Sequence, residues 1–159
     1  MTDMYKTFAS KLEETIRRTG RTIIGTWGGE EGSETAFAYT IGHADRDLPE
    51  LIVTGMNGDS AQYLLNNVGD MLFAQADRQV GDTADRGAMP REYDLGHIKV
   101  RIVDAPSAPG THALQALYRA ERKGVALKGC KQIVWPDREG NFPGDASYDA
   151  ARFPQPIIH

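Results

Sequence analysis

The segment from Asp59 to Leu72 carries the strongest helical pattern in the 159-residue chain. Asp59 is a residue type that caps helices, and the apolar side chains that follow it recur with the spacing of a single buried stripe. These side chains are Leu64, Leu65, Val68, Met71 and Leu72. The pattern predicts an amphipathic helix, which we expect to cover one face of a sheet together with a second helix around Leu117.

Short β-prone runs predict the strands of that sheet. The runs are 21–27, 35–41, 51–54, 97–103 and 132–135. A loop rich in Gly and Glu joins the first two runs and favours a hairpin, whereas 51–54 has the length and apolar character of a buried strand. No periodicity is visible from Asp77 to Gly96, which indicates an extended loop with at most a short strand.

Both ends of the chain have their own patterns. The N-terminus predicts a helix that ends at Gly20 and buries one stripe, made of Tyr5, Phe8, Leu12 and Ile16. Beyond Phe142 the chain is rich in Pro and aromatic residues without a period. The elements together predict one α+β domain over residues 1–159, with a mixed, mostly antiparallel sheet, helices packed mainly on one face and an ordered irregular C-terminal tail.

The composition excludes several classes of protein. Eighteen basic and 22 acidic side chains give a net charge of -4, so the field of the whole protein repels a polyanion and we expect no nucleic acid partner. No window approaches the ~18 apolar residues that cross a bilayer, so no membrane partner is expected. Cys130 is the single cysteine, and the N-terminus resembles no secretory signal. We therefore expect a cytoplasmic protein. The sequence does not determine its oligomeric state.

The sequence contains no motif that assigns a catalytic residue or a cofactor. The four histidines lie far apart without the spacing of a metal pair, so no metal site is predicted: they are His43, His97, His112 and His159. The nucleophile elbow of hydrolases, the P-loop and the glycine-rich dinucleotide motif are all absent. Cys130 is interpreted as a partly buried structural thiol. Catalytic residues and cofactors stay unassigned.

A first cluster of polar residues lies where one predicted strand ends and the next begins. It contains the candidate ligand-binding residues Tyr39, Thr40, His43 and Glu50. Strand ends present polar side chains to ligands, and a titratable His and Glu can act there as acid and base. The alternative is a tight turn in which Gly42 relieves backbone crowding and Glu50 accepts local N–H bonds.

A second cluster follows the last predicted strand. Its candidate ligand-binding residues are Gln132, Trp135 and Asp137. Trp135 and Phe142 can flank a ligand that Gln132 and Asp137 orient. The alternative is a β-turn whose ends pack into the core.

These blocks, taken in order, resemble a known family. The segments AFAYTIG, LPELIVTGM, AQYLLNNVGD, QIVWPDREGNFP and QPII are similar to the bacterial and phage domain-of-unknown-function family numbered 4262, from about Arg21 to the C-terminus. The resemblance implies a single α+β domain and no assignable activity. Its pattern falls on Tyr39, Thr40, Gly42, Pro49, Glu50, Gly55, Gln132, Asp137, Gly140 and Pro143.

Two positions depart from the family pattern. His43 stands where an apolar residue is expected, and Gly144 where a large aromatic is expected. Chemistry common to the family cannot depend on His43, which argues against an essential catalytic role for this side chain. Gly144 opens space in the tail.

Three functions remain compatible with the sequence. The leading hypothesis is a binding domain with a pocket between the two clusters, which recognises a small polar ligand or a segment of another protein. This pocket requires Glu50 and Asp137 to lie on the same side of the sheet. The second is a hydrolase or group-transfer enzyme with Glu50 or Asp137 as base and Tyr39 or Gln132 as orienting donor. The third is a flavin-binding split barrel, suggested by the alternation of strands and helices.

Overall fold

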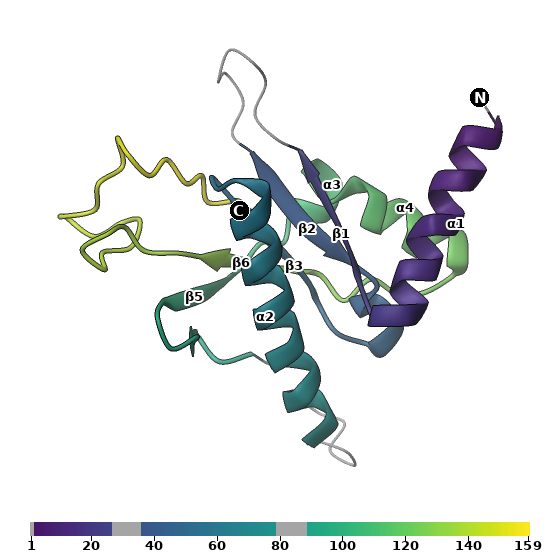
Figure 1. Cartoon of the computed structure of the whole chain (residues 1–159), viewed down its shortest axis with the longest axis horizontal. Helices are drawn as coiled ribbons and strands as arrows, with labels where there is room; N and C mark the ends of the chain where they lie inside the picture. The colour runs from purple at the N-terminus through teal and green to yellow at the C-terminus, as the bar shows by residue number, and fades with distance from the viewer. Residues whose placement is uncertain (1, 27–35, 79–88) are drawn as a thin grey trace.

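A six-stranded mixed sheet forms the centre of the molecule (Figure 1). The computed structural model describes residues 2–26, 36–78 and 89–159, with side chains from Lys6 onward. The strand order is β1-β2-β3-β6-β5-β4, and all neighbours are antiparallel except the parallel pair β3 and β6. The strands are β1 (Thr22–Thr26), β2 (Phe37–Ile41), β3 (Glu50–Thr54), β4 (Glu92–Asp94), β5 (Lys99–Asp104) and β6 (Cys130–Val134). The predicted α+β class is confirmed.

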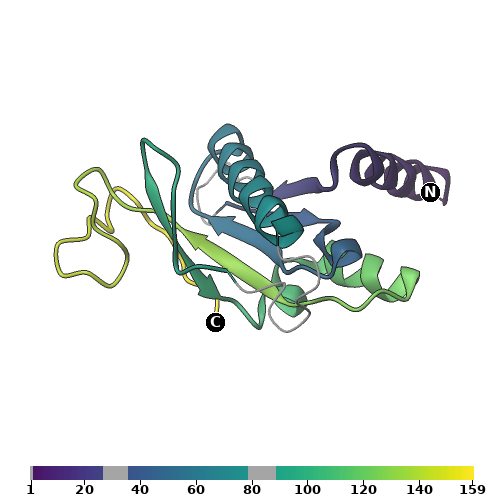
Figure 2. The same ribbon diagram turned by 90° about the horizontal axis from the view of Figure 1, so that it is seen from below.

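Helices lie on both faces of this sheet (Figure 2). The helices are α1 (Thr2–Thr19), α2 (Gly58–Arg78), α3 (Ala108–Thr111) and α4 (Leu114–Lys123), and a 3-10 helix, η1 (His43–Arg46), follows β2. Helix α2 covers one face, whereas α3 and α4 cover the opposite face. The expectation that helices pack mainly on one face was therefore wrong. Every residue of β3 is buried, so both faces of this strand need a cover.

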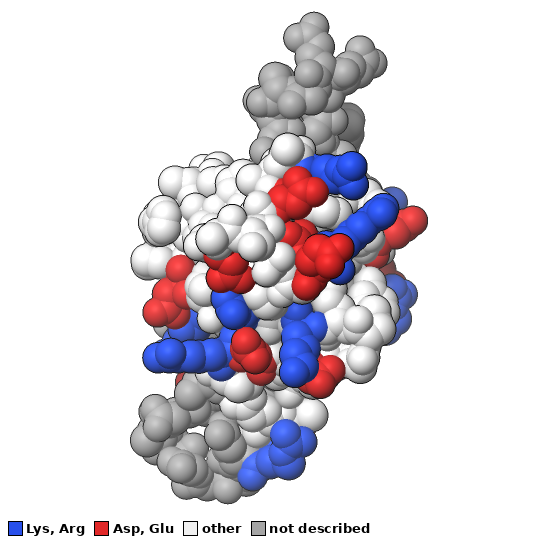
Figure 3. Space-filling model, turned by 90° about the vertical axis from the view of Figure 1, so that its left-hand side faces the viewer, with Lys and Arg blue, Asp and Glu red and all other residues white. Residues whose placement is uncertain are grey.

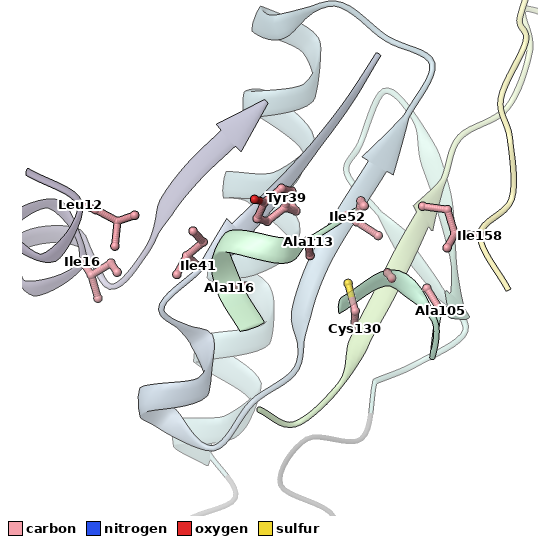
Figure 4. Packing of buried hydrophobic residues seen from close by; sticks show 11 residues of the cluster. Leu12, Ile16, Tyr39, Ile41, Ile52, Ala105, Ala113, Ala116, Cys130 and Ile158 are labelled. Carbon is pink, nitrogen blue, oxygen red and sulfur yellow. The ribbon is translucent and has the colours of Figure 1, made fainter. Parts of the chain in front are cut away.

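Successive residues of the central strands pack against different helices. Leu51 and Val53 lie in the same core cluster as Leu64 and Leu65 of α2. Ile52 points to the other face, where side chains from α1, β2, α4 and the tail meet (Figure 4). This second cluster contains Leu12, Ile16, Tyr39, Ile41, Ala113, Ala116, Cys130 and Ile158. Alternation along the strands thus joins two cores through one sheet.

Helix α1 stands partly away from the body (Figure 2). Leu12 and Ile16 of its predicted stripe are buried, but Phe8 is 45% exposed, so the stripe is buried only toward the end of the helix. The side chain of Tyr5 lies outside the described part of the chain, as do residues 27–35 and 79–88. None of the described helices is long and apolar enough to cross a membrane.

The C-terminal tail is irregular but fixed to the sheet by side-chain amides. Gln132 donates from Nε2 to the carbonyl oxygen of Pro156 at 2.8 Å and accepts the N–H of Ile158 at 2.8 Å. The hydroxyl of Thr54 also donates to Pro156. The ordered tail that the sequence predicts is therefore present, and it crosses the sheet beside Gly55.

Gly55→Ala tests this crossing. Gly55 has φ of 83°, and a Cβ placed there would lie 2.3 Å from the carbonyl oxygen of Pro154, which is backbone and cannot rotate away. We expect the variant to lose about 2–4 kcal/mol of unfolding free energy in urea denaturation. The control is Gly110→Ala in α3, where no atom beyond the chain neighbours and the helix's own backbone lies within 4 Å of the added methyl group. Equal stability of the two variants would contradict the close crossing.

Candidate functional site

The first predicted cluster is an internally bonded turn. Glu50 accepts the hydroxyl of Thr40 at 2.8 Å and the N–H groups of His43 and Ala44 at 3.2 and 3.1 Å. The Thr40 hydroxyl in turn accepts the N–H of Leu51 at 2.9 Å, one position beyond the last paired residues of β2 and β3. Glu50 is only 2% exposed. The geometry matches the alternative in which Glu50 accepts local N–H bonds.

His43 lies behind this turn and is fully engaged. Its Nδ1 is 2.9 Å from the carbonyl oxygen of Pro49, which can only accept, so Nδ1 carries the proton. Nε2 then accepts the Nε–H of Arg21 at 3.0 Å. Arg21 continues to Asp70 on α2 at 2.9 Å, and Phe73 packs against the imidazole ring. His43 therefore links the turn to helix α2.

Burial sets the proton affinities of the groups in this turn. Burial lowers the pKa of His43 to about 3 because the charged imidazolium is poorly solvated there. The same effect raises the pKa of Glu50 to about 7, against the opposing influence of its hydrogen-bond donors. Burial and then the nearby Glu50 raise the pKa of the Cys130 thiol, which disfavours the nucleophilic thiolate.

The second predicted cluster is also bonded internally. Gln132 holds the tail, and the indole N–H of Trp135 donates to the carbonyl oxygen of Thr54 at 2.9 Å. Asp137 accepts the N–H groups of Glu139, Asn141 and Asp149 at 3.0, 2.9 and 2.9 Å. Burial opposes ionisation of Asp137, but these donors outweigh it and hold its pKa below the usual value. Asp137 organises its own loop.

Tyr39 lies apart from both groups of bonds. Its side chain is 3% exposed and belongs to the core on the α4 side of the sheet. The hydroxyl oxygen accepts the N–H of Gln115 at 3.2 Å. Burial raises the pKa of this phenol. Tyr39 thus helps to place the start of α4.

Glu50 and Asp137 lie at opposite ends of the central strands. The parallel register places Glu50 level with Cys130, at the start of β6. Asp137 follows the last residue of β6. About 20 Å along the direction of β6 therefore separates Asp137 from the position of Glu50. The expectation that one ligand reaches both carboxylates was wrong. A parallel neighbour keeps equivalent ends together, and the two residues come from different ends.

A groove that the sequence did not indicate lies between α1, η1 and α4. One hollow of about 350 Å³ is lined by Glu13, Ile16, Arg17, Gly20, Gly42, Asp45, Arg46 and Lys123. A second hollow of about 360 Å³ is lined by Ala9, Ser10, Glu13, Arg17, Arg122 and Lys123. The two share Glu13, Arg17 and Lys123, so they form one continuous groove, here called the α1–α4 groove.

Arg119 binds both carboxylates of this groove. Its guanidinium donates to Glu13 at 2.6 and 2.9 Å and to Asp45 at 3.1 and 2.7 Å. Arg119 is 2% exposed, so the pairing is held at the base of the groove. The hydrogen bond from Arg119 lowers the pKa of Glu13 to about 2. Glu13 is therefore ionised, and both carboxylates are already paired with a buried cation.

Two other cations of the groove, Arg17 and Arg46, reach the solvent. Arg17 and Arg46 are exposed, and neither takes part in an ion pair within the described part of the chain. The Arg46 guanidinium lies 4.0 Å above the ring of Phe73, which fixes its plane and leaves its N–H edge available. Lys123 donates to Glu13 at 3.1 Å. The groove thus presents excess positive charge.

A larger hollow, of about 860 Å³, has most of its charged side chains in ion pairs. It lies beside β4 and β5 and is lined by Met89, Arg91, Glu92, Arg101, Ile102, Val103, Asp104 and Lys131. Arg101 pairs with Glu92, and Lys131 with Asp104. Figure 3 faces this side of the molecule and shows acidic and basic side chains interspersed. Arg91 is the one lining cation without an ion pair among the described residues, so this surface offers a single unpaired charge.

Sequence reasoning missed the groove residues because they come from three separate elements. Arg17 and Lys123 look like ordinary cations in the last turn of a helix. Arg119 alone gave a sequence signal of burial, because it lies on α4 among the small apolar residues Ala116 and Ala120. Among the described residues, no group of three His, Cys, Asp or Glu is arranged to hold a metal ion.

The fold and its internally bonded turns define a small α+β domain with an open mixed sheet. The chain belongs to the family described as domain of unknown function (DUF4262), whose model matches residues 15–149. The resemblance seen in the sequence is thereby confirmed. Comparisons with curated proteins and with solved structures found no match.

Glu50→Gln tests the buried carboxyl group. The pKa of Glu50 is about 7 in the folded chain against an ordinary 4.5, so the folded state binds more protons between these values. Glu50 therefore lowers the free energy of unfolding as the pH rises through this window. The variant lacks this decrease, and its stability relative to wild type should rise by about 2 kcal/mol from pH 4.5 to pH 7.

Urea unfolding across this pH range measures the difference. His43 has its own pH dependence in both proteins, which largely cancels in the comparison. Glu14→Gln, at an exposed position of α1, is the matched control and should run parallel to wild type. A parallel curve for Glu50→Gln as well would show that Glu50 titrates normally.

Proposed function

We propose that this protein is a binding domain whose α1–α4 groove takes an anionic ligand, most directly an acidic segment of another protein. The observation that carries the proposal is the double pairing of Arg119. Because Arg119 already compensates Glu13 and Asp45, the exposed guanidinium groups of Arg17 and Arg46 remain for an incoming anion. Guanidinium groups match carboxylates in a two-point geometry.

The shape of the groove supports an extended occupant. Its two hollows follow α1 from Ala9 to Gly20, a rise of about 16 Å, which is the length of about five residues of extended chain. Arg46 lies at one end of this path, and Arg17 lines both hollows. Cations spaced along a groove fit carboxylates spaced along a peptide better than a single small anion.

A nucleic acid is a poorer match for the same groove. The whole chain carries a net charge of -4, which repels a long polyanion beyond the contact area. A short acidic segment meets mainly the local positive field. We likewise propose no membrane partner, and a cytoplasmic location in which the lone buried Cys130 stays reduced.

The enzyme hypotheses receive no support from the geometry. Both proposed bases, Glu50 and Asp137, direct their oxygens at backbone N–H groups of their own turns. A general base must instead reach a substrate proton. The sheet is open, so the strand and helix alternation that suggested a flavin-binding split barrel does not produce a barrel here. The seven residues first predicted as ligand contacts are not part of the proposed site.

Arg17→Gln and Arg46→Gln test the groove. The probe is an acetylated hexaglutamate peptide, titrated into the protein by calorimetry at low ionic strength. Each variant should weaken binding about three- to tenfold, and added salt should weaken binding to the wild type, because the contacts are charged and exposed.

The controls are Arg138→Gln and a hexaglutamine peptide. Arg138 is exposed and lies in the loop after β6, away from the groove, so its loss should not change the affinity. Hexaglutamine should not bind. Equal affinity of both peptides, or unchanged affinity in both groove variants, would refute the proposed function.

A further inference from the structure

A separate hollow lies between the start of α2 and the turn that joins β4 to β5. Its volume is about 340 Å³, at the lower end of the range for small-molecule sites. The lining residues are Met56, Asp59, Ser60, Tyr63, Leu64, His97 and Ile98. None of them belongs to the α1–α4 groove, so this hollow is independent of the proposed function.

The wall of the hollow suits an apolar body that contains a ring. Met56, Leu64 and Ile98 supply aliphatic surface. The rings of Tyr63 and His97 lie 5.5 Å apart at an angle of 59°, and Tyr63 is 45% exposed although it is a large aromatic residue. An aromatic face left open at a hollow attracts a second ring or a cation.

One charged group defines the polarity of the ligand. Asp59 carries the formal negative charge among the lining residues, and its carboxylate makes no ion pair within the described residues. The N–H of Ser60 is already bound by the side chain of Asn57 at 2.9 Å, so the first turn of α2 is capped without Asp59. The carboxylate is therefore available to a ligand.

We propose that this hollow binds a small organic amine. The ammonium group lies between Asp59 and the ring of Tyr63, and the apolar body packs against Met56, Leu64 and Ile98. Charge complementarity selects this class. An anion would meet the carboxylate, and a neutral apolar molecule would leave it without a partner. An amine on a short apolar stem satisfies both the charge and the wall.

Three probes that share a phenyl ring on a two-carbon stem test the proposal on the full chain: phenethylamine, 2-phenylethanol and phenylacetate. Each is titrated at constant ionic strength, and the chemical shifts of the His97 and Tyr63 rings report occupancy. The amine should bind about fivefold more tightly than the alcohol, the scale of one exposed charge contact, and phenylacetate should bind most weakly.

Asp59→Asn should abolish the preference for the amine and leave binding of the alcohol unchanged. The matched control is Asp77→Asn, an exposed aspartate at the other end of α2, which should keep the preference. Thermal melts of both variants confirm folding. Equal binding of all three probes, no saturable binding, or a preference retained in Asp59→Asn would overturn the proposal. None of these outcomes bears on peptide binding at the α1–α4 groove.

Discussion

The buried carboxylate of Glu50 fixes the geometry from which the rest of the molecule is arranged. It holds the N–H groups at the start of η1 and the hydroxyl of Thr40, so the chain turns from β2 into β3 at one defined place. The turn places His43 against Arg21, and Arg21 binds Asp70 on α2. It also places Asp45 within reach of Arg119 on α4. One carboxylate thus positions helices on both faces of the sheet.

The sequence predicted the elements of the fold better than their arrangement. Alternation and helical period located β2, β5 and α2, because burial of one face leaves a period in the residues. A continuous apolar run located β3, which is buried on both faces. The second face of the sheet was missed because α4 buries small residues such as Ala116 and Ala120, which carry almost no hydrophobic signal. For the candidate site, residue type suggested function at Glu50, Gln132 and Asp137. These polar groups serve backbone atoms instead, since buried strand ends leave N–H and C=O groups that need partners.

Arg119 shows why the α1–α4 groove could not be predicted from the sequence. Its two carboxylate partners lie 106 and 74 positions away, and no local pattern joins residues so far apart. A buried guanidinium shared by two carboxylates leaves the charge at the groove mouth to other residues, here Arg17 and Arg46. Charge at a surface is thus decided by which groups are already paired. Beside β4 and β5, ion pairs among the described residues compensate every charged side chain of the larger hollow except Arg91.

Side-chain amides, and not backbone pairing, attach the C-terminal tail to β6. Pro154 and Pro156 have no N–H to donate, and the amides of Gln132 and Gln155 supply hydrogen bonds in their place. A strand of another molecule needs a regular row of donors and acceptors to pair with, and this segment presents none. Because β6 lies between β3 and β5, the tail covers interior strands and not an edge of the sheet, and two glutamine side chains attach it where no backbone pairing is available.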